Sequence, residues 1–275
     1  MWRRLRRDRL AWVGLLLLGG IGAAALFAPW LTDRDPLETD FLRRFEPPSR
    51  EHPLGTDQLG RDLLARLLYG ARYTLGAGLA ALVLILTVGT AVGLGAGLVG
   101  GRVDAFLMRI VDVLLAFPGL ILALAIVGML GPSLGNVLIG IAAVSWASYA
   151  RVVRGLVLSL REREFVEAAR ALGAPRLWVA RRHILPHVLP TVVVLASLDL
   201  GNLLLAISAL SFLGVGAQAP TPEWGRMLND ARAFLWQAPH LMLFPGLALF
   251  LVVLACNFLG DGLRDLLDPH LRQGS

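Results

Sequence analysis

The sequence predicts an all-α integral membrane protein with six transmembrane helices. Of its 275 residues 56% are hydrophobic and only 17% are charged, whereas average soluble domains carry about 25% charged residues. Six apolar runs each approach the roughly 20 residues that a helix needs to cross the hydrocarbon core of a bilayer. Because a helix satisfies its own backbone hydrogen bonds, such runs indicate helices that span a membrane.

The first apolar run covers residues 10–31 and follows an N-terminus with five arginines. Basic residues before an apolar run are also typical of a secretory signal peptide. This run is longer than the roughly 7–15 apolar residues of a signal peptide, and Pro29 and Trp30 close it without a clear cleavage pattern. We therefore expect an uncleaved first transmembrane helix.

Residues 32–53 are rich in Pro, Asp, Glu and Arg and predict an irregular linker rather than a second folded domain. In residues 57–73, Leu59, Leu63 and Leu67 recur at helical spacing with charged residues between them, which favours an amphipathic helix at the membrane surface. The sequence thus divides into residues 1–72, the first transmembrane helix with an extracytoplasmic linker, and residues 73–275, a core of five helices.

The five further spans are expected at residues 75–99, 110–130, 134–150, 188–213 and 241–259. In the second span, Gly89, Gly93 and Gly97 recur every four residues on one helix face. Small residues at this spacing let two helix backbones approach closely. We expect bundle packing there, with a substrate-lining face as the alternative.

Six spans place both termini on the same side of the membrane. Arginines cluster at the N-terminus, at Arg102 and Arg109, and in residues 151–182, and such clusters mark the cytoplasmic side. Residues 32–72 also hold seven arginines, but this loop is long and has acids in similar number, and long loops cross with less regard to charge. We expect a multi-pass plasma-membrane protein with both termini in the cytoplasm.

The least membrane-like part of the chain lies between the fourth and fifth spans. Residues 161–172 favour a helix, with Glu162 and Glu164 near its start, and Gly173 followed by Pro175 predicts a stop and a turn. The helix would carry an apolar stripe beside Glu167, formed by Phe165, Ala168, Ala169 and Leu172. Two interpretations stay open: a surface that a partner protein covers, or a solvated loop with a helical turn.

Several classes of function are excluded by residue types. All 26 cationic residues are arginines, so the chain has no P-loop lysine and no lysine for a Schiff base. HExxH is absent, and Pro186 is expected to interrupt the helix that would align His183 with His187. The arginines flank apolar spans, which argues against nucleic acid. We expect no enzyme activity, metal or other cofactor on this chain.

Polar residues at membrane depth are candidates for function. Asp199 and Asn202 lie three residues apart in the fifth span and therefore on one helix face. We expect them to line a translocation pathway; the alternative is that Asp199 pairs with an arginine or a backbone group in an interface. Residues 214–226, with Trp224, are apolar and aromatic enough to form an interfacial lid.

The charged segment resembles a known motif. Glu167-Ala168-Ala169, Gly173 six residues after Glu167, and Leu185-Pro186 are similar to the EAA loop of binding-protein-dependent ABC importer permeases. The run from His183 to Pro186 resembles the peptide and nickel branch of that family. Residues 52–72, 211–228 and 257–269 are similar to signatures of its dipeptide and oligopeptide C subunits, so the resemblance covers nearly the whole chain.

The resemblance implies a type I ABC importer permease fold with a cytoplasmic coupling helix. It assigns contact with separate ATP-binding subunits, which would hold ATP and Mg, to the EAA loop residues Glu164, Phe165, Glu167, Ala168, Ala169, Leu172, Gly173 and Pro175. It also implies a homologous second permease subunit, an extracytoplasmic solute-binding protein and a peptide substrate. The alternatives are a nickel chelate or other solute, and an ion-coupled secondary transporter. Ile207 departs from the family, whose members commonly carry Glu there.

Overall fold

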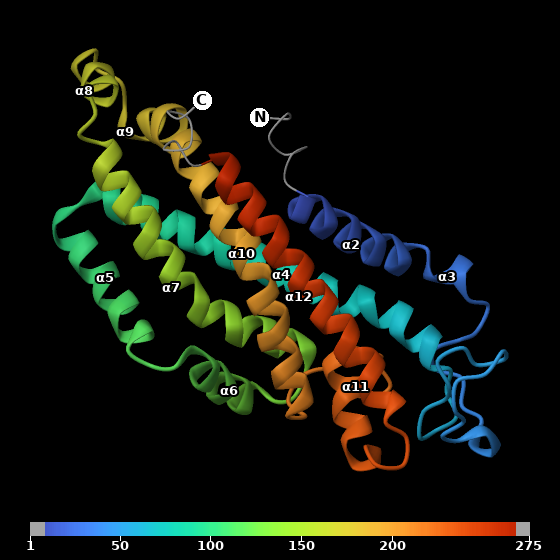
Figure 1. Cartoon of the computed structure of the whole chain (residues 1–275). Helices are drawn as coiled ribbons and strands as arrows, with labels where there is room; N and C mark the ends of the chain where they lie inside the picture. Colours follow the sequence, from blue (N-terminus) through green and yellow to red (C-terminus); the bar gives the residue numbers. More distant parts are fainter. Residues whose placement is uncertain (1–8, 268–275) are drawn as a thin grey trace.

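The computed structural model describes residues 9–267, which fold into a bundle of helices (Figure 1). Within these residues there is no β-strand, and one isolated β-bridge joins Thr56 and Asp62. The long helices run between two ends of the bundle, one that carries helix α8 and one that carries the segment 32–62 (Figure 1). We call these the α8 end and the linker end. Most of the N-terminal arginines and the last part of the 257–269 motif lie outside the described residues.

The helices follow one another along the chain with short connections. In order they are α2 (Arg9–Leu26), α3 (Ala28–Leu31), η1 (Phe41–Arg43), α4 (Leu63–Val99), α5 (Gly101–Leu115), α6 (Gly119–Leu130), α7 (Leu134–Leu160), α8 (Glu164–Ala171), α9 (Arg176–Val179), the π-helix η2 (Ala180–Ile184), α10 (Leu185–Phe212), α11 (Trp224–Ala231), η3 (Arg232–Phe234) and α12 (His240–Leu267).

Five helical segments of the described chain are long and apolar enough to cross a membrane: α2, α4, α7, the continuous α9–η2–α10 and α12. Helices α5 and α6 pass the same test only as a pair, and they bend by 92° at the break between them. The expected third span over residues 110–130 is therefore not one continuous helix but is divided at this bend. Pro118 explains the break, because proline disfavours helical backbone in the preceding residue, Phe117.

Helix α4 also differs from the expected elements. A separate amphipathic helix over residues 57–73 does not exist, since α4 runs without interruption for 37 residues from Leu63. The Asp62 carboxylate begins it by accepting a hydrogen bond from the Ala65 N–H at 2.8 Å. The first expected run is likewise divided at Phe27 between α2 and α3, and α7 continues to Leu160, ten residues past its expected end.

Gly89, Gly93 and Gly97 of α4 face α7, as the bundle-packing interpretation predicts. A Cβ atom on Gly93 would lie 2.5 Å from the Ala150 carbonyl oxygen, and one on Gly97 would lie 2.7 Å from Val157 Cβ. Gly89 meets Tyr149 in the same way, at 2.6 Å from its Cβ. Helix α4 packs more extensively against α7 than any other pair of helices in the described chain. Because glycine has no side chain, the two helix backbones can approach this closely at these positions.

The linker is irregular, as expected, but polar contacts order it. His52 Nδ1 lies within hydrogen-bonding distance of Asp62 Oδ2, at 2.9 Å, and Arg61 Nε donates to Asp57 Oδ2 at 2.6 Å. Arg66 of α4 lies 3.4 Å from the same Asp57 oxygen. All five side chains are buried, so the linker is held against the start of α4 by paired charges.

A buried acid joins three helices at the linker end. The Glu223 carboxylate accepts hydrogen bonds from the Gly225 and Arg226 N–H groups at 2.9 and 2.8 Å, which caps α11. The hydroxyls of Thr74 on α4 and Ser208 on α10 donate to it at 3.4 and 3.3 Å. Burial raises the pKa of this carboxyl, and its hydrogen bonds offset part of that rise.

Trp224, the residue after Glu223, is buried, with 2% of its surface exposed. Its indole N–H donates to the Leu67 carbonyl at 3.0 Å. The expectation that Trp224 lies at the lipid headgroups in an interfacial lid is therefore wrong. The indole finds its polar partner in the backbone of α4 instead of in the membrane interface.

We expect Glu223→Ala to lower the free energy of unfolding by about 1–3 kcal/mol, because buried donors lose their acceptor. Glu223→Gln keeps an acceptor oxygen and should cost less. The pKa of Glu223 is higher in the folded state than in the unfolded state. Its contribution to the free energy of unfolding is therefore fully present below about pH 4.3, the usual pKa of a glutamate, and is lost as pH rises through the folded-state pKa. Thermal unfolding in detergent between about pH 4 and pH 8 tests this. Parallel pH profiles of wild type and Glu223→Gln would contradict it.

Candidate functional site

The first candidate site is the segment between α7 and α10. Helix α8 (Glu164–Ala171) has two acids, Glu164 and Glu167, in its first turn and Arg170 in its last. This arrangement places each charge next to the helix end of opposite partial charge. The segment that sequence patterns predict as a helix over 161–172 is thus helical, with its start three residues later than expected.

Gly173 ends α8 as the sequence predicts. Its backbone has a φ of +83°, a conformation that favours glycine. The turn is closed by the Ala174 N–H, which donates to the Ala169 carbonyl at 3.1 Å in the manner of a Schellman motif. Pro175 then stands just before α9. Only four residues, 172–175, therefore separate α8 from α9.

Side chains beneath α8 anchor it to the bundle. Val166 is fully buried in the main core cluster, and the Phe165 ring stacks on the His187 ring at 5.3 Å between centroids. The His183 ring lies 6.0 Å from Phe165 and 5.0 Å from the Trp178 ring. Sequence reasoning missed Val166, although its spacing of three residues from Ala169 places both on the buried side.

Helices α9, η2 and α10 form one continuous helical segment. Pro186 lies directly after the π-helix η2, and the helix continues through it, so the expectation that it interrupts the helix between His183 and His187 is wrong. His187 Nδ1 lies 2.6 Å from the His183 carbonyl oxygen. Within the described residues, no group of three or more His, Cys, Asp or Glu side chains could hold a metal ion.

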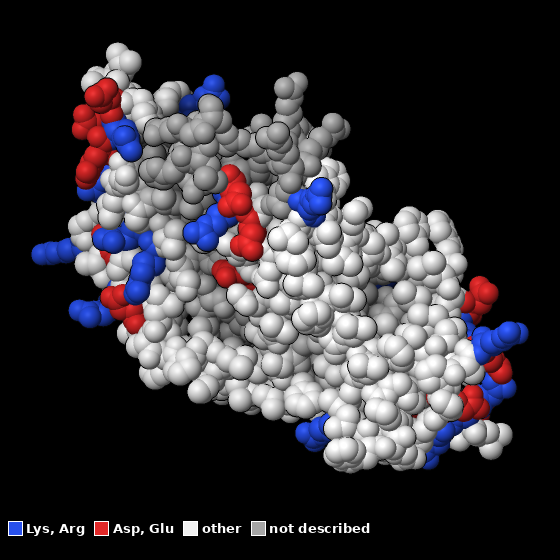
Figure 2. Space-filling view, in the orientation of Figure 1, with Lys and Arg blue, Asp and Glu red and all other residues white. Residues whose placement is uncertain are grey.

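The outward side of α8 is open. Of the residues that the EAA resemblance singles out, Ala169 is half-buried and the others are exposed: Glu164, Phe165, Glu167, Ala168, Leu172, Gly173 and Pro175. Leu172 is 89% exposed. Figure 2 shows charged side chains gathered around this end and around the linker end, with a broad uncharged surface between them.

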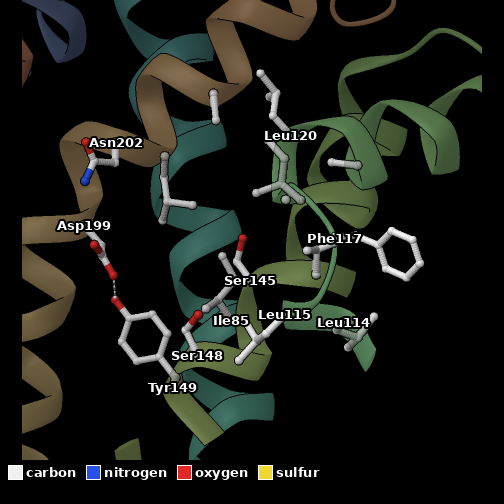
Figure 3. Close-up of a pocket in the computed structure, with 16 residues that line it drawn as sticks. Ile85, Leu114, Leu115, Phe117, Leu120, Ser145, Ser148, Tyr149, Asp199 and Asn202 are labelled. Carbon is white, nitrogen blue, oxygen red and sulfur yellow. Dashed lines mark hydrogen bonds between the residues drawn. The ribbon is translucent and has the colours of Figure 1, made fainter. Parts of the chain in front are cut away.

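The second candidate site is a groove of about 370 Å³ between α4, the α5–α6 break, α7 and α10 (Figure 3). The Tyr149 hydroxyl of α7 donates to Asp199 Oδ2 of α10 at 2.7 Å. Asn202 lies one turn further along α10 and is exposed in the groove. Ser145 and Ser148 of α7 add two hydroxyls, and the rest of the lining is mainly apolar.

The structure thus brings Asp199 and Asn202 into one groove, as their spacing suggests. Among the described residues, the hydrogen-bond partner of Asp199 is a tyrosine rather than an arginine. Sequence reasoning missed Tyr149, Ser145 and Ser148. Their signal was a cluster of polar residues inside an otherwise apolar span. Ile207, by contrast, is fully buried in the core and does not line the groove.

Two family descriptions match the chain. Residues 89–273 match the binding-protein-dependent transport system inner membrane component, and residues 1–48 match the N-terminal TM domain of oligopeptide transport permease C. The second match covers α2, α3 and part of the linker. Together the two matches account for most of the sequence.

Curated relatives are similar over nearly their whole length. The dipeptide transport system permease protein of Alkalihalophilus pseudofirmus is 47% identical over 98% of this chain and 89% of its own. The nickel transport system permease protein of Escherichia coli K12 is 48% identical over 94% of both chains. The glutathione transport system permease protein of Escherichia coli O157:H7 is 45% identical over 98% of this chain and 90% of its own.

These similarities agree with the apolar helices, the ordered EAA loop and the polar groove. They identify an importer permease rather than an ion-coupled secondary transporter. In this family ATP is hydrolysed by separate subunits. The chain belongs to the binding-protein-dependent transport system inner membrane components, the membrane-embedded permease subunits of ATP-binding-cassette importers.

Proposed function

We propose that this permease imports di- or oligopeptides as one half of a membrane channel. The observation that carries the proposal is an exposed α8 at one end of the bundle, closed by a turn at Gly173, together with a groove that holds Asp199 near the middle of α10. Identity of 47% to a dipeptide permease supports the substrate class. A homologous second permease subunit supplies the other half of the channel.

In this proposal α8 docks into separate ATP-binding subunits, which bind ATP and Mg. The contact surface consists of Glu164, Phe165, Glu167, Ala168, Ala169, Leu172, Gly173 and Pro175. The Phe165 stack and the buried Val166 support this role, because they make α8 move as one body with α9 and α10. Closure of the ATP-binding subunits would then be transmitted to the helices that line the groove.

We infer a topology in which the α8 end faces the cytoplasm, with both termini on that side. The linker end then faces outward, where an extracytoplasmic solute-binding protein delivers the substrate. Arginines near α8 and Arg102 at the start of α5 support this orientation. We retain the division into residues 1–72 and 73–275 as a functional one, although residue 72 lies inside α4.

Asp199 and Asn202 are proposed to line the translocation pathway. Both line the groove together with Ser145, Ser148 and Tyr149 of α7, and intramembrane acids typically face an interior path. Rigid-body motion of α10 with α8 would change the width of this groove and so expose it alternately to the two sides.

A second candidate substrate is a nickel chelate. The observation in its favour is the 48% identity to a nickel permease, which is as high as the 47% identity to the dipeptide permease. A chelate would reach the channel already bound by its ligands, so it requires no metal site on this chain.

Purification of the tagged protein in mild detergent, followed by identification of the chains that co-purify, tests the assembly. We expect P-loop subunits and a second permease, with ATPase activity that rises when the solute-binding protein and a dipeptide are both present. Reconstituted vesicles should accumulate the dipeptide only with ATP. Accumulation of a nickel chelate instead would favour the second candidate, and a lone chain that transports without ATP would contradict both.

A further inference from the structure

The groove holds one ionisable acid at the middle of the bundle and no basic side chain to balance it. Asp199 lies 14 residues from the start of α10 and 13 from its end, since α10 runs from residue 185 to residue 212. Among the described residues that line the groove there is no arginine or histidine. An ionised carboxylate at this depth is costly unless a positive group approaches it.

The neighbours of Asp199 orient it without neutralising it. The Tyr149 hydroxyl donates to Oδ2 and, within the described residues, the second carboxylate oxygen has no hydrogen-bond partner. Asp199 is half-buried, whereas Asn202 and Ser148 are exposed to the groove (Figure 3). The result is a carboxylate oxygen, an amide oxygen and hydroxyl oxygens, all able to accept hydrogen bonds on one side of the same cavity.

This set of acceptors suits one chemical group. A primary ammonium has three N–H donors, no acceptor and one positive charge, so it can use a carboxylate, an amide oxygen and a hydroxyl together. A bare metal ion fits less well, because no group of three or more metal-ligating side chains occurs among the described residues. The apolar opposite wall, with Leu115, Leu120 and Ala123, suits uncharged side chains of the same ligand.

We propose that Asp199, held by Tyr149, is a subsite for the ammonium group of the transported substrate, such as the free amino terminus of a peptide. The inference rests on the proposed peptide-import function and adds a ligand group to the groove. Asn202 and Ser148 complete the subsite as hydrogen-bond acceptors. The subsite selects for a positive charge at the leading or trailing end of the substrate.

Cysteine labelling of the purified importer complex in lipid nanodiscs tests the subsite without relying on the solute-binding protein. The chain has a single cysteine, Cys256, which is 2% exposed, so Cys256→Ala provides the background. Ser148→Cys then reports on the groove and Trp236→Cys, at a position 97% exposed, on a site outside the groove. Rates are measured with methanethiosulfonates that carry an ammonium or a sulfonate, from the mass of this chain.

We expect the ratio of ammonium to sulfonate rates to be about tenfold higher at Ser148→Cys than at Trp236→Cys, as one nearby charge in a partly solvated site would give. Asp199→Asn should return the ratio to that of Trp236→Cys. A free dipeptide should slow labelling of Ser148→Cys, and the same dipeptide with an acetylated amino terminus should not.

The outcomes separate the subsite from the pathway. If neither reagent labels Ser148→Cys, the groove is closed to water, and both the proposed pathway and the subsite are wrong. If labelling shows no preference for the cation, the pathway stands and the subsite is wrong, as it would be if an arginine of another subunit already paired with Asp199. Equal protection by both dipeptides would also overturn it.

Discussion

Glu167→Arg is expected to abolish ATP-driven uptake while leaving the permease folded in the membrane. Glu167 is exposed in the first turn of α8 and makes no ion pair within the described part of the chain, so the folded subunit loses little when its charge is reversed. In the proposed complex, however, the side chain lies in the interface with an ATP-binding subunit. Loss of a paired charge in a buried interface costs about 2–5 kcal/mol, or roughly 30- to 5,000-fold in affinity.

The measurement is recovery of ATP-binding subunits with the tagged permease, followed by uptake into vesicles. Glu38→Arg is a matched control, because it makes the same charge change at an exposed acid of the linker end. We expect the control to retain the ATP-binding subunits and the Glu167→Arg variant to lose them. Normal ATP-driven uptake by the Glu167→Arg complex would show that α8 does not couple the two subunits through this residue.

Replacing the three α4 glycines that face α7 is expected to have the largest effect on stability. At Gly89, Gly93 and Gly97 an added Cβ would lie 2.5–2.7 Å from atoms of α7, so the helices must separate or shift. Overpacking of this kind costs about 1–3 kcal/mol at each position. If the three costs add, the triple alanine variant loses roughly 3–9 kcal/mol, which is comparable with the total stability of many proteins, about 5–15 kcal/mol.

A control in the same helix separates packing from helix propensity. Gly76 and Gly95 have no heavy atom within 4 Å of an added Cβ, and alanine favours a helix over glycine by about 0.5–1 kcal/mol. The double variant Gly76→Ala/Gly95→Ala should therefore keep or gain stability in thermal unfolding followed by size-exclusion chromatography. The triple variant should lower the midpoint temperature of unfolding, and the double variant should not. If both variants changed the midpoint in the same direction, the α4–α7 contact would not depend on Gly89, Gly93 and Gly97.

The sequence alone determined the class of the protein and the position of its coupling segment. Apolar runs near the length of a bilayer crossing are a local property, since lipid leaves a helix no other way to satisfy its backbone. The end of α8 at Gly173 is local too, because a positive φ followed by Pro175 depends on the residues themselves. The EAA pattern and the shared helix face of Asp199 and Asn202 needed no tertiary information.

Only the tertiary structure decided how these segments meet. The unbroken α4 and the helix that continues past Pro186 depend on neighbours that supply packing and hydrogen bonds to positions where local rules favour a break. The same holds for the buried Glu223 and for Tyr149, whose hydroxyl reaches Asp199 fifty residues away in the chain. Contacts between distant residues leave no periodic signal in one sequence, because each partner alone has the composition of an ordinary helix.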